Sequence, residues 1–154
     1  RGPRQLPRVL AKRTKVQAEG ELPDAVTLRT GLRFAQSPSL IFAASDFLDW
    51  PSSLSEALVR LRHMRHDVRA ACLQTAAECE GSFDSGPAYR DPERDTAVFR
   101  FGADLREGYL RNREAHFSQV SAALRASDVQ QVAARIEQAP GDVLREWLRP
   151  RGRR

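Results

Sequence analysis

Short apolar runs and amphipathic stretches alternate along this chain. The run Leu40–Ala44 has five consecutive apolar residues, with Pro38 before it and Ser45-Asp46 after it. An unbroken run of this length is typical of a strand buried on both faces of a parallel sheet, whereas a buried helix needs roughly twice the length. We therefore predict a central strand that delivers Asp46 to the carboxyl edge of the sheet, where open α/β folds place their ligand sites.

Helical and strand-like patterns alternate on both sides of this strand. Apolar residues at helical spacing predict helices over residues 25–35, 53–64, 105–126 and 140–148. The second of these opens with a capping box of Ser53 and Glu56. Residues 66–74 are predicted to form a second parallel strand. Residues 128–136 are predicted to form a third, although Ala133-Ala134-Arg135 also fits the continuation of a helix.

Turn signals lie between the second and third of these strands. Residues 78–85 are polar and contain glycine, which indicates a loop. The turn sequence Asp91-Pro92-Glu93 is flanked by short strand-like stretches over 87–90 and 96–101, which predicts a small β-hairpin. The expected fold class is therefore α/β, Rossmann-like, with parallel central strands joined by right-handed crossovers and with an inserted β-hairpin.

The basic charge of the chain is concentrated at its two ends. The 154 residues carry a net charge of +5, but residues 1–15 hold six Lys or Arg and residues 149–154 hold four Arg, with no acid in either segment. The body between them is acidic, so the basic charge describes two tails and not a binding face. No aromatic residue interrupts the tails for base stacking, so nucleic-acid binding is not favoured. We expect a basic leader or linker over 1–21, one domain over 22–149 and a basic tail over 150–154.

Cysteine, histidine and methionine residues narrow the function classes further. Cys72 and Cys79 are too far apart for a Cys-x-x-Cys redox pair or a zinc knuckle, and the three histidines do not have a metal-ligand spacing. No apolar run approaches the ~18 residues of a membrane span, and the cysteine usage fits a reducing cytoplasm. Because Met64 is the only methionine and Arg1 stands first, we expect a fragment or the carboxyl-terminal part of a longer protein. A missing amino-terminal region would be the place for any tether to the inner membrane.

Three short motifs occur in the order of a known family: Ser45-Asp46-Phe47-Leu48-Asp49, Arg65-His66-Asp67-Val68 and Arg90-Asp91-Pro92-Glu93. In this order they resemble the bacterial family called domain of unknown function fifty-eight, whose core is similar to a von Willebrand factor A domain. The resemblance covers residues 22–149. It implies the carboxyl-terminal part of a three-layer von Willebrand factor A-like sandwich, with further parallel strands before Arg1. Without those strands one edge of the strand over 40–44 would be unpaired, which predicts a partner or self-association.

The resemblance also implies a candidate metal site at Asp46. In von Willebrand factor A domains, an aspartate after the fourth strand joins an Asp-x-Ser-x-Ser loop and a threonine in holding a divalent cation, and Asp46 matches that aspartate by position. This chain has no Asp-x-Ser-x-Ser, and Pro23 stands where the threonine is expected. The site is thus incomplete, and Mg²⁺ is expected only if an upstream loop supplies the remaining oxygen ligands. The structural interpretation of Asp46 is a strand-end carboxylate that accepts backbone amide bonds in the following turn.

Two function classes follow. The resemblance implies a non-enzymatic protein-interaction module, because proteins of this family are commonly encoded beside MoxR-type AAA+ ATPases and are thought to act with them in assembly or maturation of other proteins. The expected partner-binding residues are Ser45, Asp46, Asp49 and Trp50, with Trp50 as an exposed aromatic anchor. The alternative is a metal-dependent hydrolase or phosphoryl-transfer enzyme that uses Asp46 and Asp49. Because the chain has no Gly-rich phosphate loop, nucleophile elbow or Asp-x-Asp pair, we assign no catalytic residue.

Overall fold

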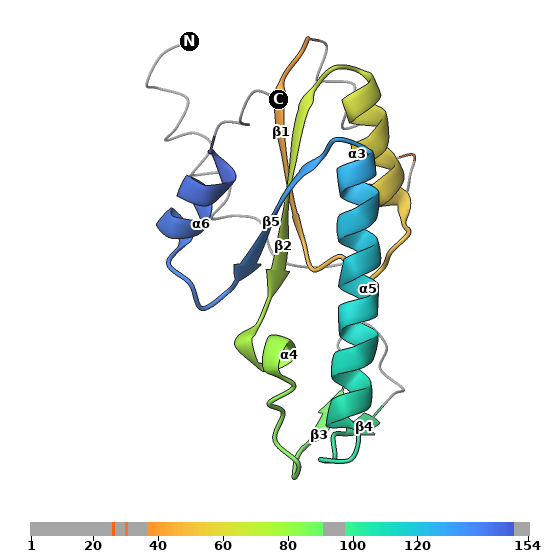
Figure 1. Ribbon diagram of the computed structural model, residues 1–154, viewed down its shortest axis with the longest axis vertical. Coiled ribbons are helices and arrows are strands. Elements are labelled where there is room, and N and C mark those ends of the chain that lie inside the picture. The colour runs from red at the N-terminus through yellow and green to blue at the C-terminus, as the bar shows by residue number, and fades with distance from the viewer. Residues whose placement is uncertain (1–25, 27–29, 31–36, 91–97, 150–154) are drawn as a thin grey trace.

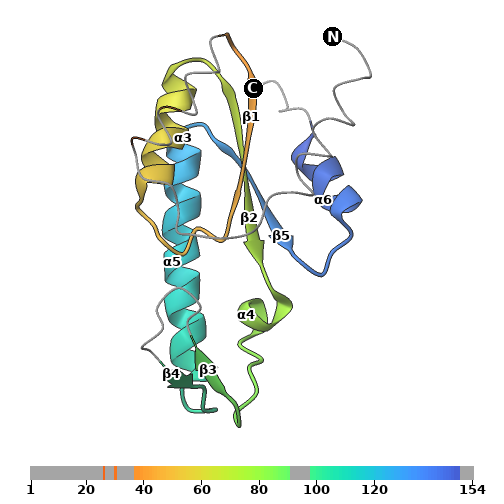
Figure 2. The ribbon, with the colours of Figure 1, turned by 180° about the vertical axis from the view of Figure 1, so that it is seen from behind.

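A parallel sheet with helices on both faces forms the body of the molecule. The computed structural model describes residues 26, 30, 37–90 and 98–149. Strands β1 (Leu40–Ser45), β2 (Asp67–Gln74) and β5 (Gln130–Arg135) are all parallel and lie in the order β1-β2-β5. Helices α3 (Ser53–His63) and α5 (Arg106–Ala126) cover one face, and α6 (Pro140–Trp147) lies on the other (Figures 1 and 2). The predicted α/β class with three parallel strands is confirmed.

The central strand of the described sheet is β2, and the prediction that β1 is central and buried on both faces is wrong. Alternate residues of β1 are exposed, with Leu40 46% and Phe42 43% accessible. In β2, by contrast, five consecutive residues starting at Val68 are buried. The difference arises because β2 pairs on both edges, with β1 and with β5, whereas β1 has β2 as its only partner strand in the described part of the chain.

The main hydrophobic core lies between the sheet and helices α3 and α5. Alternate residues of β1 and β2 point into it, with Val68, Ala70 and Cys72 almost fully buried. The helices contribute leucine and valine side chains that are no more than 2% accessible: Leu58, Leu61, Val120 and Leu124. Each such side chain contributes roughly 1.5–3 kcal/mol by leaving water. This core fixes α5 against the sheet.

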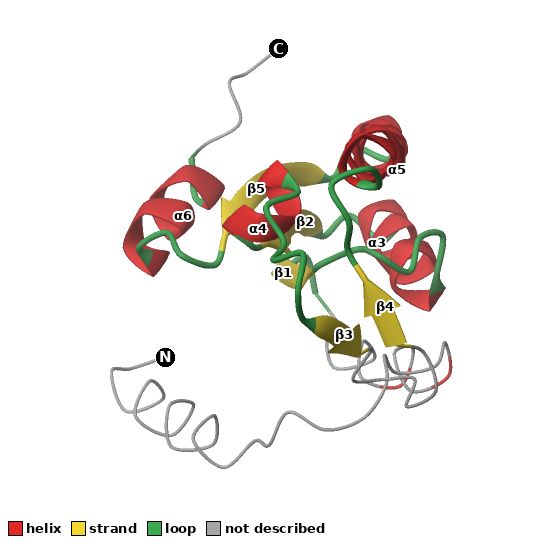
Figure 3. Ribbon diagram, turned by 90° about the horizontal axis from the view of Figure 1, so that it is seen from below, coloured by secondary structure: helices red, strands yellow, loops and turns green. Residues whose placement is uncertain are grey.

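The opposite face of the sheet is covered by α6, as the end-on view in Figure 3 shows. Trp147 packs on Ala71 and Val132, and its ring lies edge-to-face against Phe42 with 4.5 Å between ring centroids. The predicted closing helix that packs back on the sheet is therefore confirmed. The ambiguity at residues 133–135 is also resolved, because these residues are part of strand β5.

Two local predictions between the strands need correction. Helix α3 is capped by Ser52 and not by Ser53, because the Ser52 N–H donates to Oγ of Ser55 at 2.9 Å. The segment expected to be a loop from residue 78 contains a short helix, α4 (Ala76–Glu80). Helix α4 starts at a capping box of Thr75 and Glu78, and it ends at Gly81, whose φ of 60° is left-handed.

A small hairpin packs at the far end of α5. Strands β3 (Ala88–Arg90) and β4 (Val98–Arg100) are antiparallel, as predicted, while the expected turn over 91–95 lies outside the described residues. Figure 1 shows the hairpin beyond the carboxyl edge of the main sheet. The Phe83 ring joins the hairpin region to α5, with its centroid 4.7 Å from that of Phe101 and 5.3 Å from that of Tyr109. This aromatic group forms a second packing centre, separate from the sheet.

The amino-terminal predictions fall largely outside the described residues. Of the helix expected over 25–35, only Val26 and Thr30 are described; both are helical, and Thr30 Oγ1 donates to the Val26 carbonyl at 2.9 Å. The basic leader over 1–21, the segment around Pro23 and the basic tail over 150–154 are not described.

Candidate functional site

The carboxyl ends of the parallel strands, together with the middle of α5, form the candidate site. Strand β1 ends at Ser45, β2 at Gln74 and β5 at Arg135. Helix α4 follows β2 directly, and α5 passes the same edge of the sheet (Figure 1). Parallel α/β sheets place their ligand sites at this edge because the loops that leave the strands converge there.

The loop after β1 is held by hydrogen bonds of its own residues. Ser45 Oγ accepts from the Phe47 N–H at 3.1 Å, and Asp46 Oδ1 accepts from the Leu48 N–H at 3.2 Å. Phe47 has a left-handed φ of 54° and its side chain is only 2% exposed. Asp46 therefore has the turn-forming contact that the structural interpretation of the sequence expected.

Helix α5 fixes the same loop from the other side. Nε2 of His116 lies 2.8 Å from the carbonyl oxygen of Phe47. Because a carbonyl oxygen can only accept a hydrogen bond, Nε2 of His116 must carry a proton and donate it to this oxygen. The loop and α5 are thus joined by a directed contact in addition to core packing.

All four expected partner-binding residues lie at the end of β1 and in the loop that follows it. Only two of them are exposed to solvent. Asp46 and Asp49 are exposed, while Ser45 is half-buried. Trp50 is also half-buried and packs on Phe47 with 5.9 Å between ring centroids, so the expectation of an exposed aromatic anchor is wrong. The apolar side chain that this loop presents is that of Leu48, which is 60% exposed.

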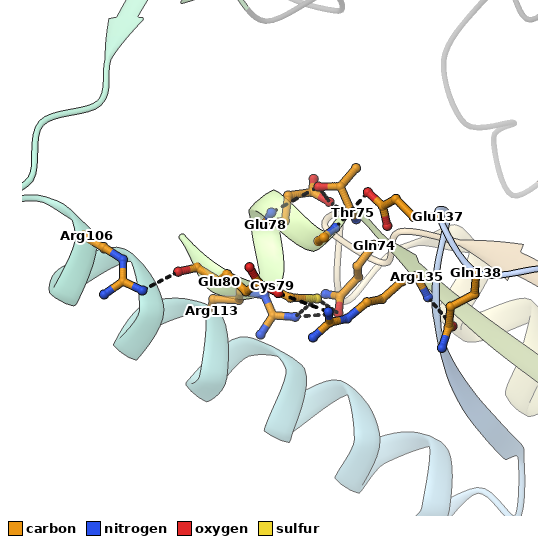
Figure 4. Close-up of polar contacts among 11 residues, drawn as sticks. Gln74, Thr75, Glu78, Cys79, Glu80, Arg106, Arg113, Arg135, Glu137 and Gln138 are labelled. Carbon is orange, nitrogen blue, oxygen red and sulfur yellow. Dashed lines mark hydrogen bonds and ion pairs between the residues drawn. The ribbon is translucent and has the colours of Figure 1, made fainter. Parts of the chain in front are cut away.

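A polar network joins the end of β2 to α5, and no sequence motif indicated it. Nη2 of Arg113 donates to Oε1 of Gln74 at 2.5 Å and lies 3.1 Å from Sγ of Cys79 (Figure 4). The guanidinium also lies over the Phe117 ring, 5.1 Å from its centroid. The last residue of the central strand is thereby linked to the middle of α5.

Two buried donors of this network have no acceptor among the residues that the structure describes. They are Nε of Arg113 and Nε2 of Gln74. The Gln74 amide is oriented by its neighbour, because the oxygen must face the Arg113 donor and the nitrogen then lies on the other side. A buried donor without an acceptor costs about 1–3 kcal/mol, so two such groups in one place are unusual in a structural network.

A cavity of about 260 Å³ has Gln74 and Arg113 among the residues that line it. Its apolar wall includes Leu48, Leu73 and Phe117, and its polar wall includes Gln74 and Arg113. Asp46, Glu78 and His116 also line it. The cavity therefore combines one guanidinium, two carboxylates, the amides of Gln74 and Asn112 and an apolar wall at the edge where parallel sheets bind ligands.

Ion pairs and hydrogen bonds around α4 fix the rim of the site. Arg135 Nη1 lies 3.1 Å from Oε1 of Glu80, and Arg106 Nη2 donates to the Glu80 carbonyl at 2.7 Å. Oε1 of Glu137 accepts from the Ala76 N–H at 3.0 Å, and this backbone hydrogen bond lowers the pKa of Glu137. These contacts attach α4 to β5 on one side and to α5 on the other.

Two groups near the cavity have raised pKa values. Burial raises the pKa of Cys72 to about 11, and Asp46, Cys79 and Glu78 add to the effect while Arg113 opposes it. Burial also raises the pKa of Tyr109, whose hydroxyl donates to the Glu78 carbonyl at 3.1 Å. Cys72 therefore stays a neutral thiol near neutral pH and is not a nucleophile there.

Magnesium at Asp46 stays a prediction. Within residues 37–90 and 98–149, no three His, Cys, Asp or Glu side chains come together as a metal site. One oxygen of Asp46 already accepts the Leu48 N–H. A hard cation needs several oxygen ligands, so the described residues do not by themselves fit a magnesium ion.

Comparison with known proteins gives no match: no protein-family model, no curated protein and no solved structure matches the chain. The resemblance to the family called domain of unknown function fifty-eight therefore rests on the three short motifs. No helix in the described residues is long and apolar enough to cross a bilayer.

Proposed function

We propose that the chain is a non-enzymatic protein-interaction module of the von Willebrand factor A-like class, acting with a MoxR-type AAA+ ATPase in assembly or maturation of other proteins. The strand order β1-β2-β5 with helices on both faces is compatible with the carboxyl-terminal part of such a domain. The proposed family and partner rest on the motif resemblance, whereas the proposed binding surface rests on the geometry of the loop after β1.

The observation that carries the proposal is how Asp46, Leu48 and Asp49 are presented to solvent. The residues between and after them, Phe47 and Trp50, are anchored in the core. Leu48 is 60% exposed between two exposed carboxylates. A loop that is fixed before binding loses little conformational entropy when it binds, and an exposed apolar side chain with polar neighbours is typical of a contact anchor.

Binding to a purified MoxR-type AAA+ ATPase tests this proposal. We expect Leu48→Asp to weaken binding at least about tenfold, because it replaces the apolar contact by a third carboxylate. Asp46→Asn should weaken binding less, because the amide oxygen still accepts the Leu48 N–H and only the charge is lost. Leu148→Asp is the matched control, since Leu148 is 52% exposed and lies at the end of α6.

Each outcome decides between function classes. If wild type, Leu48→Asp and Leu148→Asp bind equally, the loop is not part of the interface. If the wild type does not bind, the ATPase is not the partner. A metal-dependent hydrolytic or phosphoryl-transfer turnover that disappears when Asp46 and Asp49 are both replaced would favour the enzyme class instead.

A further inference from the structure

His66 is a buried histidine directly before β2, and it has no part in the proposed partner interaction. The Ser39 N–H donates to Nδ1 of His66 at 3.1 Å. The carbonyl oxygen of Ser39 accepts from the Asp67 N–H at 2.9 Å, next to the pairing of β1 with β2 that begins at Leu40. The imidazole therefore extends the attachment of β1 to β2 by one residue beyond the start of the strand.

The direction of this hydrogen bond fixes the charge of the His66 ring. A backbone N–H can only donate, so Nδ1 must be without a proton and the imidazole must be neutral. If Nδ1 took up a proton, two donors would face each other and the bond would be lost. Histidine is the side chain that ordinarily changes its charge between pH 5 and 8. Protonation of this ring therefore acts directly on the contact with Ser39.

The charged groups around His66 do not favour an imidazolium. From α3, Nη1 of Arg62 donates to the His66 carbonyl oxygen at 2.7 Å, which places a cation beside the residue. The carboxylate of Asp128, before β5, pairs with Arg62, and that of Asp67 pairs with Arg69, so each already has a cationic partner. Because His66 is only 2% exposed, a charge on its ring would also be poorly hydrated. Protonation thus requires the ring or the chain before β1 to move.

The other two histidines tolerate protonation. His116 donates through Nε2 to the Phe47 carbonyl, and this bond persists when Nδ1 also carries a proton. His63 is exposed in the last turn of α3, and Arg65 after that helix is exposed as well, so water hydrates the charge of both. In the described part of the chain, His66 is therefore the histidine whose protonation breaks a hydrogen bond.

We propose that His66 is an acid-sensitive switch: the neutral imidazole holds Ser39 and the chain that enters β1, and protonation of the imidazole releases them. Within the described residues β1 pairs with β2 alone, so no second strand holds its start. The switch goes beyond the proposed function, because it lies at the end of β1 opposite to the loop that presents Leu48.

The test is ¹⁵N NMR of the full chain between pH 8 and pH 5. The scalar coupling across the hydrogen bond, between the Ser39 amide nitrogen and Nδ1 of His66, reports the contact. The ¹⁵N chemical shift of Nδ1 reports the protonation of the ring in the same samples. We expect the coupling to be present at pH 8 and to disappear in step with the protonation of His66. The Ser39 amide proton should shift upfield over the same titration as its hydrogen bond is lost.

The variant His66→Asn separates the contact from the charge. The Asn side-chain oxygen can occupy the position of Nδ1 and accept the Ser39 N–H, but the amide does not titrate. We expect the Ser39 amide shift to be independent of pH between 8 and 5 in this variant. His63→Asn is the matched control on the exposed end of α3 and should keep the pH dependence of the wild type. Circular dichroism checks that both variants are folded, and the wild-type titration decides the matter if His66→Asn is not.

Four results would each overturn the proposal. They are the absence of the coupling at pH 8, a coupling that persists after the ring is protonated, a ring that stays neutral down to pH 5, and an unchanged pH dependence of Ser39 in a folded His66→Asn variant.

Discussion

Nη1 of Arg69, in the central strand, donates a hydrogen bond of 2.6 Å to the carbonyl oxygen of Trp147, 78 residues further along the chain. Arg69 is only 8% exposed, and its Nη2 lies 3.0 Å from Oδ2 of Asp67. The last carbonyls of a helix have no partner within the helix, and a cation near them interacts favourably with the helix dipole. Arg69 therefore serves as the carboxyl-terminal cap of α6 and attaches that helix to the sheet.

Replacing Arg69 should loosen α6. We expect Arg69→Met to lower the free energy of unfolding by about 1–3 kcal/mol, because the Trp147 carbonyl loses a charged donor while Asp67, which is partly exposed, can return to water. Urea denaturation followed by tryptophan fluorescence measures this change. The control Arg111→Met removes an exposed pair with Glu107 and should change stability by no more than about 0.5 kcal/mol. Equal effects of both substitutions would show that Arg69 does not hold α6.

The core between the sheet and α5 should be sensitive to truncation. Leu124 is 1% exposed, so Leu124→Ala is expected to cost about 2–5 kcal/mol through lost burial and the cavity that remains. Leu144→Ala on α6, where the leucine is 47% exposed, should cost far less. Thermal and chemical denaturation of the two variants compare them, and a smaller loss at Leu124 than at Leu144 would contradict the packing described above.

Two glycines should respond to alanine in opposite directions. Gly81 has a left-handed φ of 60°, and an added Cβ would lie 3.2 Å from Cγ of Arg106, so Gly81→Ala should destabilise the protein by about 1 kcal/mol or more. Gly108 lies within α5 with nothing within 4 Å of its added Cβ, and Gly108→Ala should stabilise by about 0.5–1 kcal/mol. Melting temperatures of the two single variants test this pair, and a shift in the same direction would refute it.

Titration of Cys72 should make stability fall at alkaline pH. The pKa of this thiol is raised from 9.0 to about 11 in the folded protein, so between these values the folded chain retains a proton that the unfolded chain has lost. The free energy of unfolding should therefore be unaffected by this group below about pH 9 and decrease as the pH rises from about 9 to about 11. Chemical denaturation across this range should show a shallower decrease for Cys72→Ala than for wild type.

Cys79 provides the comparison for that experiment. It is less buried than Cys72, so Cys79→Ala should leave the alkaline decrease in place. Mass spectrometry after brief treatment with iodoacetamide should find Cys79 modified before Cys72, because the thiolate is the reactive form and Cys72 is both buried and neutral. Identical alkaline decreases in the two alanine variants would show that Cys72 does not cause the effect.

The sequence pattern predicted the types of most elements but not the position of the central strand. Strand β1 has an unbroken apolar run, whereas the apolar run of β2 is interrupted by Arg69. The charge of Arg69 is accommodated by Asp67 and by the end of α6, which is distant in sequence. Such a contact cannot be seen in a local pattern. Helix α4 was missed, although Thr75 and Glu78 have the spacing of a capping box before Gly81.

Only part of the candidate site could be predicted from the sequence. The turn at Asp46 follows from an Asp at the end of an apolar strand, but Trp50 was misplaced because its packing on Phe47 depends on the path of the loop. Arg113 and His116 were missed because Tyr109 and Phe117 mark an apolar helix face. Both polar residues occur at helical spacing on that same face, and a charged residue among inward-facing positions was the signal available.

Helix α5 is longer than the sheet that it covers. Its 21 residues extend about 32 Å, while the eight residues of β2 extend about 26 Å, and Figure 1 shows its first turns beyond the strand ends beside the hairpin. Tyr109, in the aromatic group, and Arg113, in the polar network, are one helical turn apart. One continuous helix therefore carries Tyr109 at the hairpin, Arg113 in the polar network, and Val120 and Leu124 in the core. The hairpin and the cavity thus share one rod of secondary structure, because the aromatic group packs on the same helix that supplies Arg113 to the cavity lining.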